Sequence, residues 1–242
     1  MLRSPDKQIR CFQKHLRTHF SDADLSVIVY GSSVNGRGYT RDTDMCVVLK
    51  RDDLDLGELK HALNACFTEL DVRFYYAREL ANPVFFRDIN SGTFAIEYLA
   101  GGVSLIGGNP FADLLTRISR PAYRRSLKQK MFDYVLRMRR VFLNKKRGKE
   151  ELQFLHKYCR RVLIDLLLFN ELESFAILNG LSLSEVLERA VAHRIIPSQF
   201  KDVPHGKRSD LFDYFFALNA HIGPIVFGLP DDHIMTVDER DS

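Results

Sequence analysis

The sequence holds only four cysteines among its 242 residues, and they are scattered without a CxxC pair. That distribution argues against a disulfide framework or a structural zinc site, and it favours a reducing cytoplasmic location. The longest apolar runs are far too short to cross a bilayer, and the first residues lack the apolar stretch of a secretory signal. We therefore expect a cytoplasmic globular protein with no membrane partner.

Several common motifs are also missing. The chain has no GxGxxG dinucleotide fingerprint, no GxxxxGK[ST] phosphate loop and no HExxH zinc-hydrolase motif. Glycine and proline are too few for a low-complexity or collagen-like chain. What remains, with 45% hydrophobic and 27% charged residues, is an ordinary globular composition. The length suits one large domain or two smaller ones.

The net charge of +4 is unevenly distributed along the chain. Residues 1–109 carry a net charge of −1, residues 110–149 a net +11, and residues 150–242 a net −6. Positive charge concentrated in this way favours phosphate-rich partners, either a nucleotide or a nucleic-acid backbone. The alternative interpretation is a solvated basic helix face. If the partner is RNA, we expect it to bind the basic segment 117–149.

The residue patterns predict an α/β (α+β) fold with two domains. The spacing of apolar residues and the turn signals predict strands over 25–30, 43–49, 71–76 and 103–106, and helices over 6–20, 56–70 and 83–99. Farther along, helices are expected over 127–142 and 152–169, after the Ser182–Glu185 capping box, and over 210–221. We expect a mixed sheet with flanking helices at 1–112, followed by a helical domain at 113–242.

The most informative stretch runs from Tyr30 to Asp44 (YGSSVNGRGYTRDTD). Gly31 permits a tight turn and close approach of the backbone to a phosphate. Ser32 offers a hydroxyl and an N–H where a helix N-terminus would favour an anion. Asp42 and Asp44 lie two residues apart at the start of an expected strand, so their side chains point to the same face.

Two neighbouring carboxylates repel each other, and a divalent cation relieves that repulsion. Hard oxygen ligands suit Mg²⁺ or Mn²⁺ bound together with substrate phosphates. A third carboxylate on a neighbouring strand would complete a two-metal site that acts on a nucleoside triphosphate. Asp71, which begins the next expected strand, is our candidate. Glu97 is the alternative if its segment is a strand, and is otherwise expected to be a surface helix residue.

Gly31-Ser32 followed by Asp42-x-Asp44, with apolar residues on both sides, resembles the nucleotidyltransferase superfamily that includes DNA polymerase beta. Residues 31–36 are similar to the poly(A) and poly(U) polymerases of that superfamily, and the layout after Asp71 resembles its small bacterial and antibiotic-modifying members. The resemblance covers the predicted N-terminal domain. It implies a nucleoside triphosphate donor, Mg²⁺, Ser32 as the phosphate-binding serine, and Asp42, Asp44 and Asp71 as metal ligands.

Further candidates are basic or aromatic. Ser33, Arg37 and Arg41 lie in the same loop, and the planar fork of arginine suits phosphate. Basic residues of the second domain are candidates for the donor phosphates or an RNA acceptor, the alternative being a basic outer face: Arg124, Arg125, Lys128 and Lys130. Two tyrosines are candidates for stacking on a base, although aromatic residues at helical spacing usually belong to the core: Tyr134 and Tyr158.

The sequence thus predicts a metal-dependent nucleotidyltransferase that moves a nucleoside monophosphate from an NTP to an acceptor hydroxyl, with release of pyrophosphate. The acceptor is left open between an RNA 3′ end or tRNA, a small molecule and a protein. The alternative is a non-catalytic, regulatory or antitoxin-like protein of the same fold that binds a protein partner. Such a protein would typically lose an acidic ligand, whereas this sequence keeps every candidate.

Overall fold

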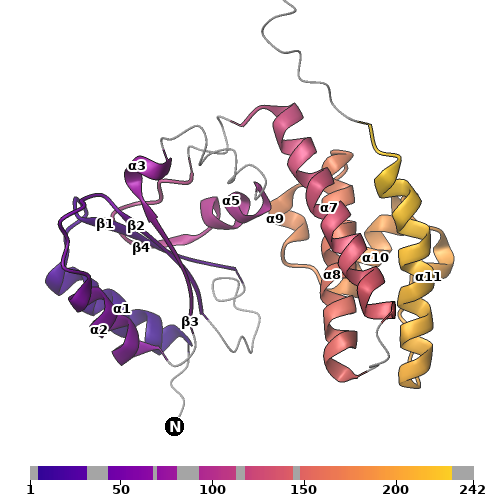
Figure 1. Ribbon diagram of the computed structural model, residues 1–242, viewed down its shortest axis with the longest axis horizontal. Helices are drawn as coiled ribbons and strands as arrows, with labels where there is room; N and C mark the ends of the chain where they lie inside the picture. The colour runs from indigo at the N-terminus through magenta and orange to yellow at the C-terminus, as the bar shows by residue number, and fades with distance from the viewer. Residues whose placement is uncertain are drawn as a thin grey trace, which may run out of the picture. The chain divides into compact units, whose positions relative to one another are not determined.

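Figure 1 shows a strand-containing N-terminal part and a helical C-terminal part, so the predicted mixed α/β class is confirmed. The structure, a computed structural model, describes residues 5–31, 43–67, 70–80, 93–112, 118–143 and 148–230. The chain divides into two compact units, Met1–Ile118 and Ser119–Ser242. No helix in the described ranges is long and apolar enough to cross a membrane.

The described part of the N-terminal unit contains one sheet with strand order β3-β2-β1-β4. Its strands are β1 (Leu25–Tyr30), β2 (Thr43–Leu49), β3 (Leu70–Tyr76) and β4 (Val103–Ile106), which confirms all four expected strands. Strand β1 is antiparallel to β2 and β4, whereas β2 and β3 are parallel. Parallel neighbours need a crossover connection, and helix α2 (Leu56–Cys66) lies in that connection.

Two helices of this unit begin close to where the sequence predicted them. Helix α1 spans Pro5–His19, and α2 begins after Asp55, whose side chain accepts a hydrogen bond from the Gly57 amide. The expected helix over 56–70 was wrong at its end, because the backbone becomes extended at Phe67 and Leu70 already belongs to β3. The short helix α3 spans Ala77–Leu80, and α5 spans Thr93–Ala100. The rest of the expected helix over 83–99 lies outside the described residues.

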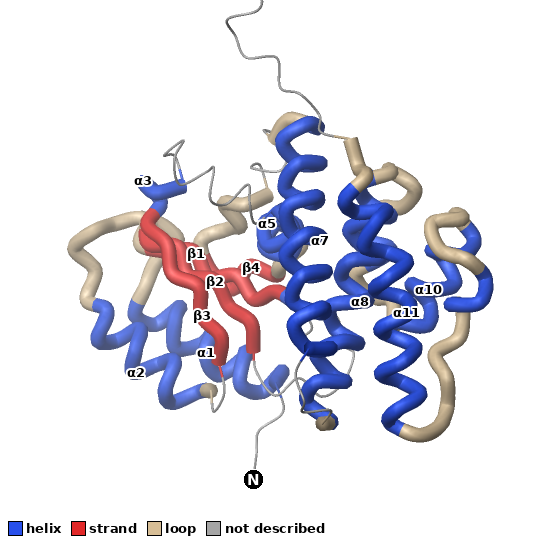
Figure 2. Tube along the Cα trace, turned by 45° about the vertical axis from the view of Figure 1, so that its right-hand side comes forward, coloured by secondary structure: helices blue, strands red, loops and turns tan. Residues whose placement is uncertain are grey.

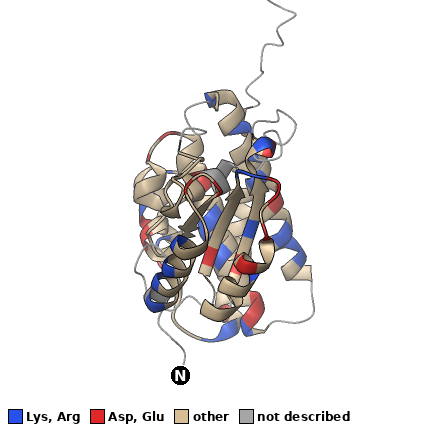
Figure 3. Cartoon of the chain, turned by 90° about the vertical axis from the view of Figure 1, so that its left-hand side faces the viewer, with Lys and Arg blue, Asp and Glu red and all other residues tan. Residues whose placement is uncertain are grey.

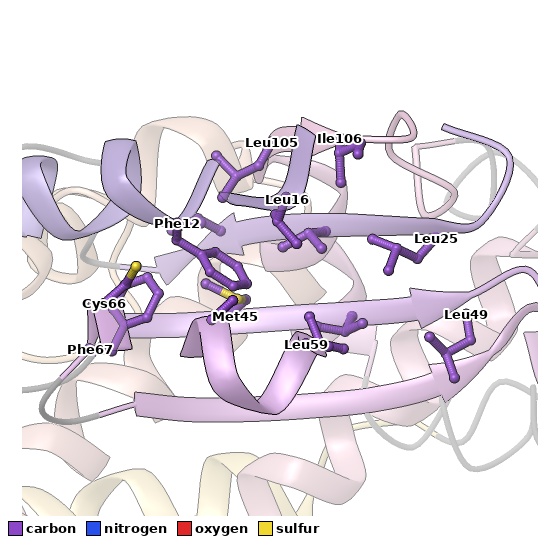
Figure 4. Packing of buried hydrophobic residues seen from close by; sticks show 14 residues of the cluster. Phe12, Leu16, Leu25, Met45, Leu49, Leu59, Cys66, Phe67, Leu105 and Ile106 are labelled. Carbon is purple, nitrogen blue, oxygen red and sulfur yellow. The ribbon is translucent and has the colours of Figure 1, made fainter. Parts of the chain in front are cut away.

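The two faces of the sheet bury different sets of side chains. On one face, α1 and α2 cover the strands, and Figure 4 shows Phe12 and Leu16 of α1 beside Met45 of β2. On the other face, Leu99 of α5 and Phe111 pack against strand residues. Those strand residues are Ile28, Tyr30, Cys46 and Val48. Because successive side chains of a strand alternate between faces, Asp44 belongs to this second face, together with Cys46.

The C-terminal unit is helical (Figure 2). Its helices are α7 (Arg120–Leu143), α8 (Lys149–Phe169), α9 (Phe175–Leu178), α10 (Leu183–Ala192), the 3₁₀ helix η2 (Ser198–Phe200) and α11 (Arg208–Phe227). Helices α7, α8 and α11 pack against one another. The predicted apolar stripe of α7 is buried at Leu127, Met131, Val135 and Met138. The predicted capping box is present, since Ser182 and Glu185 exchange hydrogen bonds at the start of α10.

Candidate active site

Three of the polar residues on the α5 face meet at one end of the sheet. Tyr30 is the last residue of β1 and pairs in register with Asp44, near the start of antiparallel β2. Asp44 in turn pairs in register with Asp71, near the start of parallel β3. Residues in register on adjacent strands point to the same face, with their strands about 4.8 Å apart. The structure therefore brings Asp44 and Asp71 side by side, as the sequence analysis expected of a metal site.

Gly31 forms the turn that follows β1 and lies against Asp44. Its φ of +72° is in the left-handed region, which glycine adopts without steric cost. A Cβ atom at this position would lie closer than 3.0 Å to Oδ2 of Asp44. A residue with a Cβ would therefore have to adopt a strained backbone conformation here and displace the Asp44 carboxylate. The role found for Gly31 is to leave room for that carboxylate.

The charges around these carboxylates include Arg73, two residues beyond Asp71 on the same face. Burial raises the pKa of the Tyr30 phenol to about 12; Arg73 opposes this rise, and Asp44 and Asp71 add to it. Burial alone would lower the pKa of the Arg73 guanidinium. The interactions with Tyr30, Tyr75 and Asp71 outweigh this effect, so the pKa is raised. The end of the sheet thus combines two carboxylates with one arginine. Figure 3 marks the acidic and basic residues on the described elements.

Cys46 continues the same face beyond Asp44 and pairs in register with Arg73. Burial raises the pKa of its thiol to about 12, with Arg73 acting in the opposite direction. At neutral pH the thiol is therefore protonated, and its packing against Ile28 and Val48 makes it part of the core.

Glu97 lies on helix α5, so the condition under which it would be the third carboxylate, a strand at this segment, is not met. The expectation that it would otherwise be exposed was wrong, since Glu97 is only 9% exposed. Its burial follows from the packing of α5 on the sheet through Leu99, two residues farther along. Asp71 remains the carboxylate that the register places beside Asp44.

The other predicted residues of the loop lie outside the described residues. They are Ser32, Ser33, Arg37, Arg41 and Asp42. The described site is therefore built from Gly31, Asp44 and Asp71, to which the structure adds Tyr30 and Arg73. Sequence reasoning missed Arg73, although its spacing of two from Asp71 on an expected strand indicates that both side chains face the same way.

The donor set fits a hard divalent cation. Two carboxylates on adjacent strands provide oxygen ligands from one side only, which leaves the remaining coordination positions for water and phosphate oxygens. Mg²⁺ is typically held in this way, by one or two carboxylates together with substrate phosphates. Asp71 is exposed and Asp44 half-buried, so both are accessible for coordination. Asp44 and Asp71 are thus the described residues that fit Mg²⁺ or Mn²⁺.

The basic residues predicted in the second unit make many contacts within that unit. Lys128 is 9% exposed, and its Nζ donates a hydrogen bond to the Leu229 carbonyl at 2.6 Å. The guanidinium of Arg124 lies over the Phe169 ring, 4.3 Å from its centroid. Arg125, by contrast, is exposed. The alternative interpretation, a basic outer face, is therefore wrong for Lys128, which is buried within the unit.

Lys130 is half-buried and acts on Asp165, a fully buried residue of α8. Burial raises the pKa of Asp165 to about 7, while Lys130 and Arg161 oppose this rise. The candidate stacking residues contact each other, since the ring centroids of Tyr134 and Tyr158 lie 4.9 Å apart. Burial raises the pKa of the Tyr134 phenol to about 12. Both tyrosines are half-buried and pack against each other within the helical unit.

A groove between α2 and β3 lies on the opposite face of the sheet and is mostly apolar. Its lining is Leu56, Leu59, Lys60, Leu63, Asn64, Phe67, Leu70, Val72 and Phe74. None of the predicted site residues lines it, and it offers no acid or nucleophile for catalysis. The predicted metal ligands that the structure describes, Asp44 and Asp71, lie instead on the other face, at the end of the sheet. Comparison of the sequence with models of protein families finds no match, and a search of curated proteins finds none either.

Proposed function

We propose that this protein is a metal-dependent nucleotidyltransferase, which transfers a nucleoside monophosphate from an NTP to an acceptor hydroxyl and releases pyrophosphate. The observation that carries the proposal is the register pair Asp44 and Asp71, held beside the left-handed turn at Gly31. The Gly31-Ser32 and Asp42-x-Asp44 motifs, which resemble the nucleotidyltransferase superfamily, support the same conclusion.

In the proposed reaction, Asp44 and Asp71 hold the cation, with Asp42 as a further ligand. Mg²⁺, when bound, neutralises charge on the phosphates and lowers the pKa of the acceptor hydroxyl. Arg73 lies on the same face and provides a permanent positive charge for a phosphate oxygen. Gly31 keeps the space next to the Asp44 carboxylate free of side chains. These residues orient the donor so that the acceptor oxygen attacks the α-phosphorus opposite to the leaving pyrophosphate.

RNA is the acceptor to test first, because residues 110–149 carry a net charge of +11. Several cations of this stretch are used inside the helical unit, so the exposed ones, such as Arg125 and Arg140, carry the proposed contact. Binding that rests on phosphate contacts weakens steeply as salt is added. RNA affinity that does not change with salt would exclude this part of the proposal and leave a small molecule or a protein as acceptor.

The test is transfer of label from each of four α-³²P-labelled NTPs in the presence of Mg²⁺ and total cellular RNA. Asp44→Asn and Asp71→Asn should each lower transfer by more than about 100-fold, because even outer-shell partners of metal ligands are worth 10- to 100-fold. Asp53→Asn is the matched control, since it removes an exposed carboxylate of the same unit that pairs with Arg51. It should leave transfer unchanged.

Label in RNA would identify both the donor and the acceptor class, and label on protein would identify a protein acceptor. Equal transfer by wild type, Asp44→Asn and Asp71→Asn would contradict the proposed mechanism. Nucleotide binding without transfer to RNA, protein or a panel of small hydroxyl compounds, together with a stoichiometric co-purifying protein, would instead favour a non-catalytic regulatory role.

A further inference from the structure

Helices α1 and α2 bring a second set of metal-binding side chains together on the face of the sheet opposite to Asp44. Cys11 of α1 faces Cys66 of α2, with the two Sγ atoms 2.9 Å apart. His19 of α1 faces Glu58 of α2, with Nδ1 and Oε2 3.8 Å apart. The helices are therefore antiparallel. Residues four apart lie on one side of a helix, so His15 lies between Cys11 and His19 on the side that faces α2.

The side chains of His15, His19 and Glu58 lie close enough together to coordinate one metal ion after small movements. His15 Nε2 lies 3.9 Å from Glu58 Oε2, and the ligand atoms of all three residues lie within 4.8 Å of one another. The imidazole rings are stacked, with centroids 4.4 Å apart. Zinc–ligand bonds of about 2.0–2.2 Å place neighbouring ligand atoms of a tetrahedral site roughly 3.4 Å apart. Small side-chain rotations would close the present gaps around one ion.

The surroundings of the cluster also suit an ion. Nε2 of His15 is buried and makes no hydrogen bond within the described chain. Such a nitrogen loses its interaction with water without gaining a partner, which costs free energy. The side chains of His19 and Glu58 are 39% and 50% exposed, so the cluster opens to solvent. An ion can therefore enter from outside, and a water molecule can complete its coordination.

We propose that His15, His19 and Glu58 form a site for a divalent transition metal of the Zn²⁺ class. Two imidazole nitrogens and one carboxylate oxygen are a zinc-type donor set, whereas Mg²⁺ prefers oxygen ligands. The site is independent of the proposed catalytic cation at Asp44 and Asp71. Bound metal would join α1 to α2 and stabilise the N-terminal unit by linkage, because the unfolded chain does not hold the three ligands together.

The experiment is calorimetric titration of Zn²⁺ into the metal-free, reduced full chain, with excess Mg²⁺ present to occupy the carboxylates of the other site. We expect one Zn²⁺ per chain for the wild type. His19→Ala and Glu58→Gln should each weaken this binding by about 10-fold or more. Both residues are partly exposed and outside the buried core, and circular dichroism and thermal unfolding without zinc would verify that each variant is folded.

Two controls separate the proposed site from other zinc ligands. His193→Ala removes a histidine whose Nε2 lies 3.1 Å from Glu173 Oε1, a His–carboxylate pair in the other unit. Cys11→Ser removes one thiol of the Cys11–Cys66 pair, which offers competing soft ligands on the same two helices. Both variants should bind Zn²⁺ as the wild type does. Zinc should also raise the unfolding temperature of the wild type and of both controls, but not that of His19→Ala.

The proposal would be overturned by zinc binding that is lost in Cys11→Ser but kept in His19→Ala and Glu58→Gln, since the thiols would then be the ligands. Absence of zinc binding by the wild type would overturn it as well. Co²⁺ gives an independent readout, because a tetrahedral site with nitrogen and oxygen ligands absorbs in the visible range without the thiolate charge-transfer band. Such a band in the wild-type spectrum would count against the histidine site.

Discussion

A Cβ atom on Gly31 would lie closer than 3.0 Å to Oδ2 of Asp44, so a side chain at the turn after β1 would overlap with the carboxylate on β2. The glycine of the Gly31-Ser32 motif therefore lies directly beside the second aspartate of the Asp42-x-Asp44 motif. Gly31 and Asp44 are distant in the sequence but lie together at the end of the sheet, because Tyr30 pairs in register with Asp44.

Gly31→Ala should therefore displace the Asp44 carboxylate. We expect a loss of Mg²⁺-dependent nucleotide transfer of more than about 10-fold, together with a destabilisation of about 1–3 kcal/mol from the left-handed backbone. Gly108→Ala is a matched control, because Gly108 has a φ of +74° and nothing within 4 Å of its added Cβ. Gly108→Ala should be destabilised by its left-handed backbone to a similar extent, but it should keep full nucleotide transfer. Equal losses of transfer in both variants would show that the contact with Asp44 is unimportant.

The regular elements could be predicted from the sequence because apolar runs and turn residues are local signals. The end of α2 could not, since Leu63, Phe67 and Leu70 continue a helical spacing while the chain is already extended at Phe67. The burial of Glu97 depends on the packing of α5, which no local pattern contains. The contact of Lys128 with the Leu229 carbonyl joins residues 101 positions apart.

The candidate site could likewise be predicted only in part from the sequence. Asp44 and Asp71 could be proposed from their positions at the start of two expected strands, but only the sheet order makes them neighbours in register. The four-residue spacing of His15 and His19 is visible in the sequence and was overlooked there. This spacing indicates a metal site only together with Glu58. The packing of α1 against α2 brings Oε2 of Glu58 within 3.9 Å of a ring nitrogen of each histidine.

Asp165 should make the helical unit less stable as pH rises. Its folded-state pKa of about 7 lies above its ordinary value of 3.8, because burial disfavours the carboxylate. Between these values the folded chain binds more protons than the unfolded chain, so this residue lowers the free energy of unfolding as pH increases through that window. The slope contributed is at most about 1.4 kcal/mol per pH unit.

Asp165→Asn removes this titration. The free energy of unfolding of the variant should therefore increase relative to that of the wild type from pH 4 to pH 7. At higher pH the difference between the two should stay constant. Urea unfolding at several pH values measures the difference. Asp213→Asn, an exposed residue of α11, serves as the control and should follow the wild type. A difference between Asp165→Asn and wild type that is independent of pH would contradict the assigned pKa.

The four thiols should differ sharply in their reaction with the aromatic disulfide DTNB. Cys46 and Cys159 are buried, and burial raises the pKa of each thiol to about 12, so neither should react in the folded protein at pH 8. Cys11 is partly exposed. DTNB should form a mixed disulfide at Cys11 and release one thionitrobenzoate.

Cys66 should then resolve this adduct, because its Sγ lies 2.9 Å from that of Cys11. Its thiolate attacks the Cys11 sulfur, forms the Cys11–Cys66 disulfide and releases a second thionitrobenzoate. Absorbance should show two equivalents, and the intact mass should fall by two hydrogen atoms. Cys66→Ser should release one equivalent and retain the aromatic adduct. A stable adduct on the wild-type chain would show that Cys66 does not reach Cys11.

The capping box of α10 should contribute measurably to the stability of the helical unit. The Ser182 Oγ accepts a hydrogen bond from the Glu185 amide at 3.3 Å, and the Ser182 amide donates to Glu185 Oε2 at 2.6 Å. Ser182→Ala leaves the Glu185 amide without its acceptor and should cost about 1 kcal/mol of unfolding free energy. Ser184→Ala is the matched control, since this serine is exposed inside the same helix and alanine favours helix. Urea midpoints at an unchanged m-value measure both, and a Ser184→Ala loss as large as that of Ser182→Ala would count against the cap.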